Sequence, residues 1–359
     1  MLLGLLACTS PGDTGETAVD PGCLPEVGLY EVGADSTEIH VSTAFDGQRL
    51  WASWVRPNDS STFDVVLSAL DCSGEEVIGP IAVTDSPDNE IDPALAVAGD
   101  RLLLAWPGSA GGMSIRTRVY DLEGNPLTEV TPFEGSRGGV PVTGNATGPR
   151  LRATDEGWVM AGYWGHEEAP AFQAFSVTLD WDGQPVGDAV DAQLDADFGQ
   201  TAVDLVVDPL VLVWQEDSTT STESILQASD GSLDTPGLRP TLAYNDGLWA
   251  AWDDDRGEVT LRPPSADPLV LALDGFHHSP RLVGNALLTM KVEDGVYNSL
   301  HLHRVNASGV VASVELPTAT APSVYGVDLT PLGEDRVAVG YADGQNPDFQ
   351  ARVAVIELP

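Results

Sequence analysis

The sequence predicts an all-β protein built from one repeated unit, and three observations lead to this prediction. A short apolar run that ends in an aromatic or other large residue recurs seven times along the 359 residues. No stretch shows a sustained 3.6-residue period, which an amphipathic helix would need. In addition, 26 prolines and 37 glycines interrupt the chain throughout, as expected for short strands joined by tight turns.

The recurring run gives the length of the unit. Its seven copies end 38 to 58 residues apart, and they are Leu50–Trp54, Leu102–Trp106, Trp158–Trp164, Val211–Trp214, Leu248–Trp252, Leu287–Met290 and Val337–Tyr341. A unit of about 46 residues has room for four short strands and their turns. We therefore expect seven four-stranded sheets.

The second unit shows how the four strands follow one another. Pro93–Val97 reads as the first strand, and Leu102–Trp106 reads as the second after a Gly-Asp turn. Ile115–Tyr120 alternates with period two, as a third strand does. An Asp-Leu-Glu-Gly turn then leads into a fourth strand near Leu127–Thr131. Related Asp/Asn-Gly turns recur in other units, so the same order of strands is expected throughout.

Seven such units resemble a seven-bladed β-propeller, in which radial closure hides the edges of the sheets. The last unit supplies only three strands, while an apolar segment at Val27–Val32 precedes the first inner strand at Glu38–Ala44. We expect that segment to be the outer strand of the seventh blade and to close the ring. A six-bladed or eight-bladed ring and a pair of sandwiches remain alternatives. WD40 and sialidase motifs do not occur in the sequence.

The N-terminus carries a second resemblance. Leu5-Leu6-Ala7-Cys8 is similar to the lipobox of bacterial lipoproteins, although no Lys or Arg precedes the apolar run. This resemblance implies cleavage before Cys8, lipidation of its thiol, and anchoring in the bacterial cell envelope, at the outer membrane or cell surface. Seven apolar residues are too few for a transmembrane helix. We expect residues 1–8 to be the signal peptide and lipidated cysteine, 9–26 a flexible tether, and 27–359 a single propeller domain.

Two cysteines remain once Cys8 is lipidated. Cys23 lies at the start of the folded region and Cys72 lies in the first long hairpin. An even number of cysteines in an oxidising compartment favours a disulfide. The alternative is a pair of buried free thiols.

The charge balance excludes some partners. Asp and Glu number 55 against 16 Lys and Arg, which gives a formal net charge of −39. Nucleic-acid binding requires a basic surface, so we expect no nucleic-acid partner. The same charge disfavours binding to anionic lipid headgroups, so contact with a membrane is expected through the lipid anchor only.

Arginines and acidic loops near the predicted mouth of the propeller are the candidate ligand-binding residues. Arg150, Arg239 and Arg281 each lie next to a proline at the start of an inner strand, where three guanidinium groups would clamp a carboxylate or phosphate. The loop that contains Asp253, Asp254 and Asp255 lies at the same end of the ring. The alternative is that the arginines pair with neighbouring carboxylates and that the acids are solvated.

Metal and catalytic sites receive weaker support. Asp253, Asp255 and Glu258 are the densest candidates for Ca²⁺, but no calcium-loop motif is present. His277 and His278 are candidates for a general base. Buried histidines whose ring nitrogens already have hydrogen-bond partners are, however, the more common case. His301 and His303 share a strand face without a third zinc ligand at a recognisable spacing. No nucleophile motif and no phosphate-binding loop occurs.

We therefore expect an envelope-anchored and non-catalytic propeller that binds a protein, peptide or glycan through its loop face. The alternative is an extracytoplasmic polysaccharide hydrolase or lyase that uses carboxylates of the central funnel as acid and base. A structural role in envelope assembly is a third possibility. The fold does not decide among these functions.

Overall fold

The structure is a computed structural model, and it contains strands but no α-helix in the part of the chain that it describes. The described residues are 23–33, 38–60, 62–109, 113–133, 136–137, 140–141, 146–165, 172–192, 198–218, 224–293, 296–316, 322, 326–345 and 348–359. Residues 1–22, with Cys8 and most of the expected tether, lie outside these ranges. No helix within the ranges is long and apolar enough to cross a membrane.

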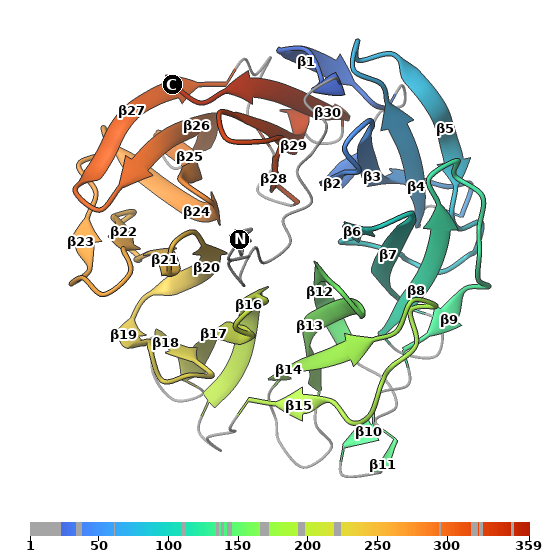
Figure 1. The fold of residues 1–359 in the computed structure, drawn as a ribbon, viewed down its shortest axis with the longest axis horizontal. Coiled ribbons are helices and arrows are strands. Elements are labelled where there is room, and N and C mark those ends of the chain that lie inside the picture. The colour runs from blue at the N-terminus through green and yellow to red at the C-terminus, as the bar shows by residue number, and fades with distance from the viewer. Residues whose placement is uncertain are drawn as a thin grey trace, which may run out of the picture.

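Seven antiparallel sheets of four strands form a ring around a central axis, and we number them as blades 1 to 7 in chain order (Figure 1). Blade 1 contains β2 (Ile39–Phe45), β3 (Leu50–Pro57), β4 (Phe63–Leu70) and β5 (Glu76–Ala82). Blade 2 contains β6 (Ala94–Ala98), β7 (Arg101–Gly108), β8 (Ser114–Asp121) and β9 (Thr131–Pro132). Blade 3 contains β12 (Ala146–Thr154), β13 (Gly157–Gly165), β14 (Phe172–Leu179) and β15 (Val190–Asp191).

The remaining blades have the same order of strands from the axis outwards. Blade 4 contains β16 (Phe198–Val206), β17 (Val211–Ser218), β18 (Ser224–Ala228) and β19 (Asp234–Pro236). Blade 5 contains β20 (Leu238–Tyr244), β21 (Leu248–Asp253), β22 (Val259–Arg262) and β23 (Leu269–Val270). Blade 6 contains β24 (Phe276–Val283), β25 (Ala286–Glu293), β26 (Val296–Asn306) and β27 (Gly309–Glu315). A separate hairpin, β10 (Ser136–Arg137) and β11 (Val140–Pro141), lies between blades 2 and 3 in the chain.

Blade 7 is shared between the two ends of the chain. It contains β28 (Asp328–Pro331), β29 (Arg336–Gln345), β30 (Asp348–Glu357) and, as its outer strand, β1 (Gly28–Glu31). β1 pairs antiparallel with β30, with Gly28 opposite Val355 and Glu31 opposite Arg352. The seven-bladed fold and its closure by the N-terminal strand are therefore confirmed.

A disulfide lies next to this closure. Cys23 and Cys72 are bonded, with Cα atoms 5.6 Å apart, and they connect the segment before β1 to the hairpin between β4 and β5. The Glu26 backbone N–H also donates to the Cys72 carbonyl at 2.8 Å. Cys23 and Glu26 thus both contact the β4–β5 hairpin just before β1.

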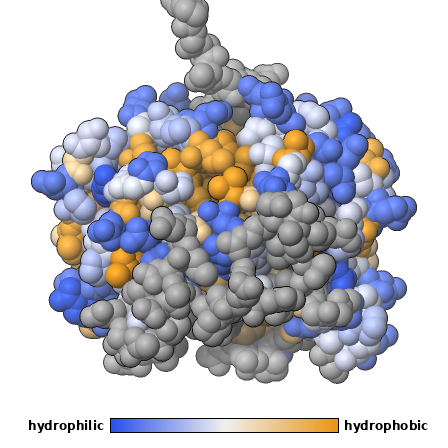
Figure 2. All heavy atoms as spheres, turned by 90° about the horizontal axis from the view of Figure 1, so that it is seen from below, coloured by the Kyte–Doolittle hydropathy of each residue, from blue (hydrophilic) through white to orange (hydrophobic). Residues whose placement is uncertain are grey.

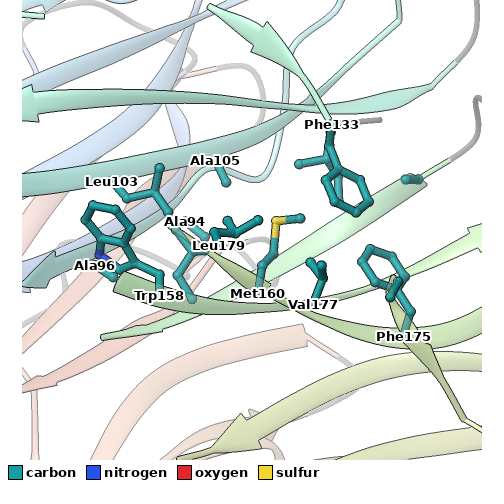
Figure 3. Close-up of a cluster of buried hydrophobic side chains, with 14 of the residues drawn as sticks. Ala94, Ala96, Leu103, Ala105, Phe133, Trp158, Met160, Phe175, Val177 and Leu179 are labelled. Carbon is teal, nitrogen blue, oxygen red and sulfur yellow. The ribbon is translucent and has the colours of Figure 1, made fainter. Parts of the chain in front are cut away.

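The hydrophobic core is divided into seven clusters, one between each pair of neighbouring blades. Figure 3 shows the cluster between blades 2 and 3, where Leu103 and Phe133 face Trp158, Met160 and Phe175. The tryptophans of the second strands are buried in these clusters, which explains why the aromatic position recurs in the sequence. Hydrophilic residues dominate the outer rim in Figure 2, with an apolar patch among them.

One outer strand is shorter than the sequence suggested. The fourth strand of unit 2, expected near Leu127–Thr131, is only β9 (Thr131–Pro132). Pro126 forms an isolated bridge with Tyr120, and β9 pairs with β8 only at Thr131 and Pro132. Because proline has no N–H to donate, a strand that contains it pairs over only a few residues.

Candidate functional site

The entrance of every inner strand has the same unusual backbone conformation. One residue in each blade has a positive φ between +46° and +71°, and these residues are His40, Asp92, Gly148, Ala202, Arg239, Ser279 and Gly326. In five blades the strand register shifts directly after this residue, as in a β-bulge. At Gly326 only glycine fits, because a Cβ atom would lie 2.1 Å from the Cα of His40. We call these seven residues the entrance residues.

The second residue after each entrance residue lines a central cavity of about 360 Å³. These seven positions form a ring, which we call the ring residues, and they are Ser42, Ala94, Arg150, Asp204, Thr241, Arg281 and Asp328. The inner strands that carry them surround the axis in Figure 1. The repeated backbone conformation therefore places one side chain from each blade on the wall of the cavity.

Ring residues of blades 4 and 5 connect neighbouring blades. Asp204 Oδ2 accepts hydrogen bonds from Thr241 Oγ1 at 2.9 Å and from the Leu242 backbone N–H at 3.0 Å. Thr241 Oγ1 in turn accepts from the backbone N–H of Leu282 in blade 6 at 3.2 Å. One carboxylate and one hydroxyl thus join blades 4, 5 and 6 beside the cavity.

Blades 7, 1 and 2 are joined in the same way. Asp328 Oδ2 accepts from Ser42 Oγ at 3.0 Å and from the Thr43 backbone N–H at 2.8 Å. Ser42 Oγ accepts from the backbone N–H of Leu95 in blade 2 at 3.2 Å. Because these carboxylates and hydroxyls are already engaged with the wall, they hold the cavity in shape.

Arg150 and Arg281 are the ring residues of blades 3 and 6, and their guanidinium groups donate to backbone carbonyls beside the cavity. Arg150 Nη1 donates to the carbonyl of Pro149 at 2.9 Å. Arg281 Nη1 donates likewise to Pro280 at 3.1 Å, and its Nε donates to Val327 at 3.3 Å. Nε and Nη2 of Arg150 and Nη2 of Arg281 have no hydrogen-bond partner among the described residues. Guanidinium N–H groups therefore remain available to a ligand in the cavity.

Charges around the cavity affect the two arginines differently. Burial acts against the charge of Arg150, but Asp92, Asp204 and Asp328 outweigh it and raise the Arg150 pKa. Burial and the positive charge of Arg150 together lower the pKa of Arg281. Arg281 also has no carboxylate within 4 Å in the described part of the chain. Its positive charge is therefore less balanced by neighbouring negative charge than that of Arg150.

Asp92 lies beside Arg150 at the mouth of blade 2. Its Oδ2 is 3.9 Å from Arg150 Nη1, and its Oδ1 is 3.7 Å from Nδ1 of His40. Burial alone would raise the pKa of Asp92. The neighbouring His40 imidazole and the charge of Arg150 outweigh burial and lower this pKa to about 2. Asp92 is thus a carboxylate at neutral pH.

The structure separates Arg239 from the other two predicted arginines. Arg239 is an entrance residue and not a ring residue, and it is absent from the cavity lining. Its Nε donates to Asp253 Oδ2 at 2.9 Å, and its Nη2 lies 2.9 Å from Nδ1 of His278. Asp253 is fully buried and also accepts from the Ser279 backbone N–H at 2.6 Å. Of the three predicted arginines, the structure thus brings Arg150 and Arg281 to the cavity, and Arg239 lies outside its lining.

The acidic loop after Asp253 does not form a cation site. Asp254 Oδ1 accepts from the backbone N–H groups of Arg256 and Glu258, so this carboxylate shapes the turn. Glu258 pairs with Arg256 at 3.0 Å, and Asp255 is exposed. No group of three or more His, Cys, Asp or Glu side chains within the described ranges is arranged to hold a metal ion. The residues present therefore do not fit the suggested Ca²⁺ site.

The histidines of blade 6 form a buried network away from the cavity. His277 Nδ1 lies 2.8 Å from Thr289 Oγ1, and this hydroxyl lies 2.9 Å from Nε2 of His303. Burial is the main reason that the pKa of His277 falls to about 4 and that of His303 to about 3. Neither His277 nor His278 lines the cavity. They are not placed to act as a base on a ligand there.

Comparisons with known proteins identify the fold and not a family. No family model matches the chain, and no curated protein sequence matches it. A protein of unknown function from Dyadobacter fermentans has a TM-score of 0.55 at 12% identity, covering 94% of this chain and 100% of that one.

Two other solved structures are similar over most of their length. An α-L-arabinofuranosidase from Fusarium graminearum has a TM-score of 0.53 at 11% identity, covering 93% of this chain and 98% of that one. The β-propeller domain of the Trilobed protease from Pyrococcus furiosus has a TM-score of 0.52 at 8% identity, covering 91% and 97%. At such low identity these likenesses establish that the chain has the β-propeller fold.

Proposed function

We propose that this protein is a non-catalytic binding protein of the bacterial cell envelope that recognises an anionic group of a protein, peptide or glycan. The observation that carries the proposal is the pair Arg150 and Arg281, which line the central cavity and keep N–H groups that have no partner among the described residues. Guanidinium groups bind carboxylates and phosphates through charge-assisted, often bidentate, hydrogen bonds. The site lies on rigid inner strands, which favours recognition without rearrangement.

The alternative, a polysaccharide hydrolase or lyase, receives no support from the carboxylates of the cavity. Glycoside hydrolysis requires one carboxyl group that donates a proton and a second that acts as base or nucleophile. Asp92 has a pKa of about 2 and is ionised, whereas Asp204 and Asp328 each use both oxygens to hold the wall. Glu90 has a pKa raised by burial, but it pairs with Arg116 outside the cavity lining.

Binding is tested with matched acidic and neutral ligands. We expect oligogalacturonate or oligoglutamate to bind, and neutral galactan oligosaccharides and oligoglutamine not to bind, in isothermal titration calorimetry. Salt near 0.15 M is needed to screen the repulsion between these anions and a surface with a net charge of −39. The double variant Arg150→Gln/Arg281→Gln should weaken binding by at least about tenfold, because it removes charged hydrogen-bond donors.

Arg101→Gln is the matched control, since Arg101 pairs with Asp182 and does not line the cavity. Its affinity for the acidic ligands should equal that of the wild type. Equal binding of acidic and neutral ligands, or unchanged binding by the double variant, would refute anion recognition in the cavity.

Envelope anchoring is a separate part of the proposal, supported by the lipobox-like residues that end at Cys8. We expect the wild-type chain to fractionate with bacterial membranes and Cys8→Ser to appear in the soluble fraction, because the serine accepts no lipid. Cys72→Ser keeps Cys8 and should remain with the membranes. Release of the wild type without detergent would contradict anchoring, and it would leave the binding proposal intact.

A further inference from the structure

The ring residues contain the same triplet twice. Going round the ring in chain order, blades 3, 4 and 5 present Arg150, Asp204 and Thr241. Blades 6, 7 and 1 then present an arginine, an aspartate and a hydroxyl again, as Arg281, Asp328 and Ser42. Blade 2, with Ala94, is left over. The cavity therefore has two similar halves.

The hydrogen bonds repeat together with the residue types. In each half the aspartate accepts from the hydroxyl of the next blade and from the backbone N–H that follows that hydroxyl. Each arginine donates from Nη1 to the carbonyl of the proline directly before it. Each triplet thus fixes its aspartate in the wall and leaves its arginine as the group that meets a ligand.

The two arginines belong to opposite parts of the wall. Blades 4 and 5 lie between blade 3 and blade 6 on one side of the ring, and blades 7, 1 and 2 lie between them on the other (Figure 1). The cavity of about 360 Å³ falls within the roughly 300–1,000 Å³ range of small-molecule sites. A single carboxylate would occupy a small part of that space. A ligand that reaches both arginines would fill more of it.

We infer that the cavity has two anion subsites, one at Arg150 and one at Arg281, and that it takes a compact ligand with an anionic group at each of two ends. This inference rests on the proposed function, because it assigns the ligand class of the same site. The Arg281 subsite has no carboxylate within 4 Å among the described residues, whereas Asp92 lies 3.9 Å from Arg150. The subsite at Arg281 is therefore expected to bind its anion more tightly.

Linear dicarboxylates of increasing length provide the test. Succinate, glutarate and adipate are titrated into the full-length protein by calorimetry, with butyrate as the ligand that has one carboxylate. We expect one of the dicarboxylates to bind at least about tenfold more tightly than butyrate, since its second carboxylate adds a charged hydrogen-bond contact that butyrate lacks. This preference should depend on length, because only one separation matches the distance between subsites.

Single variants separate the two subsites. Arg150→Gln and Arg281→Gln should each abolish the preference for the dicarboxylate, and Arg281→Gln should weaken butyrate more than Arg150→Gln does. Arg101→Gln should keep the wild-type values. Thermal unfolding of each variant shows whether the fold is retained.

Each result has a distinct meaning. Equal affinity of the wild type for butyrate and for every dicarboxylate would overturn the two-subsite inference and leave anion recognition standing. A preference lost in only one single variant would also overturn it. If none of these probes binds, and the acidic oligomers also fail to bind, the proposed function itself is wrong.

Discussion

Replacing Cys72 with serine should lower the free energy of unfolding by about 4 kcal/mol. The disulfide joins residues 49 positions apart, and cross-linking a loop of about 50 residues removes roughly this much chain entropy from the unfolded state. The loss should appear in denaturant titrations as a lower midpoint. Dithiothreitol should shift the wild type to the same midpoint.

Cys8→Ser is the control for this experiment, because Cys8 is the third cysteine of the chain and is not part of the bond. It should unfold like the wild type and respond to dithiothreitol in the same way. A wild-type midpoint that reductant does not change would show that the bond contributes nothing to stability.

Acid should destabilise the native state through the histidine network of blade 6. His277 and His303 have pKa values of about 4 and about 3 in the fold, against about 6.5 in an unfolded chain. Below pH 6.5 the unfolded chain therefore binds protons that the folded protein does not, and the fold loses stability as pH falls. At pH 5 each histidine accounts for up to about 2 kcal/mol, because one pKa unit corresponds to 1.36 kcal/mol.

The pH range identifies the groups involved. The histidine contribution develops between pH 6.5 and about 4 for His277, and it continues to about 3 for His303. Asp92, with its pKa lowered to about 2, adds stability above pH 3.8 that is lost only between pH 3.8 and 2. Denaturant titrations at pH 8, 6, 5 and 4 therefore cover the range in which the two histidines lose their contribution and Asp92 keeps most of its own.

His303→Asn provides the matched comparison, since the amide does not titrate and can still hydrogen-bond to Thr289 or Ser313. Whatever its stability at pH 8, this variant should lose less stability than the wild type between pH 8 and pH 4. An identical loss in the two proteins would exclude His303 as a cause of acid sensitivity.

The sequence was sufficient to predict the seven blades and the closure of the ring by the N-terminal strand, because both depend on hydrophobic periodicity. The aromatic second strands and the orphan segment at Val27–Val32 fill interblade clusters and the edge of blade 7, and these are the strongest requirements of the fold. The outer strand of blade 2 was overestimated because Pro126 and Pro132 have no backbone N–H to donate. Apolar patterning alone does not reveal that loss.

The sequence predicted some of the residues that line the cavity, namely Arg150 and Arg281. The position of the entrance residue explains why Arg239 does not line it. Arg150 and Arg281 follow a proline and become ring residues, whereas Arg239 precedes its proline and becomes an entrance residue bonded to Asp253. Two positions of difference along the strand decide whether a side chain meets the cavity. Asp204 and Asp328 were missed because blades 4 and 7 have no proline at the bulge to mark the register.

The place of the disulfide has a mechanical consequence. Cys23 precedes β1, so tension applied to the chain ahead of Cys23 passes through the covalent bond into the β4–β5 hairpin of blade 1. Without that bond, the same tension would separate β1 from β30. The two strands are paired over four residues, and their separation would open the ring. The disulfide therefore protects the pairing of β1 with β30 from tension on the chain that precedes Cys23.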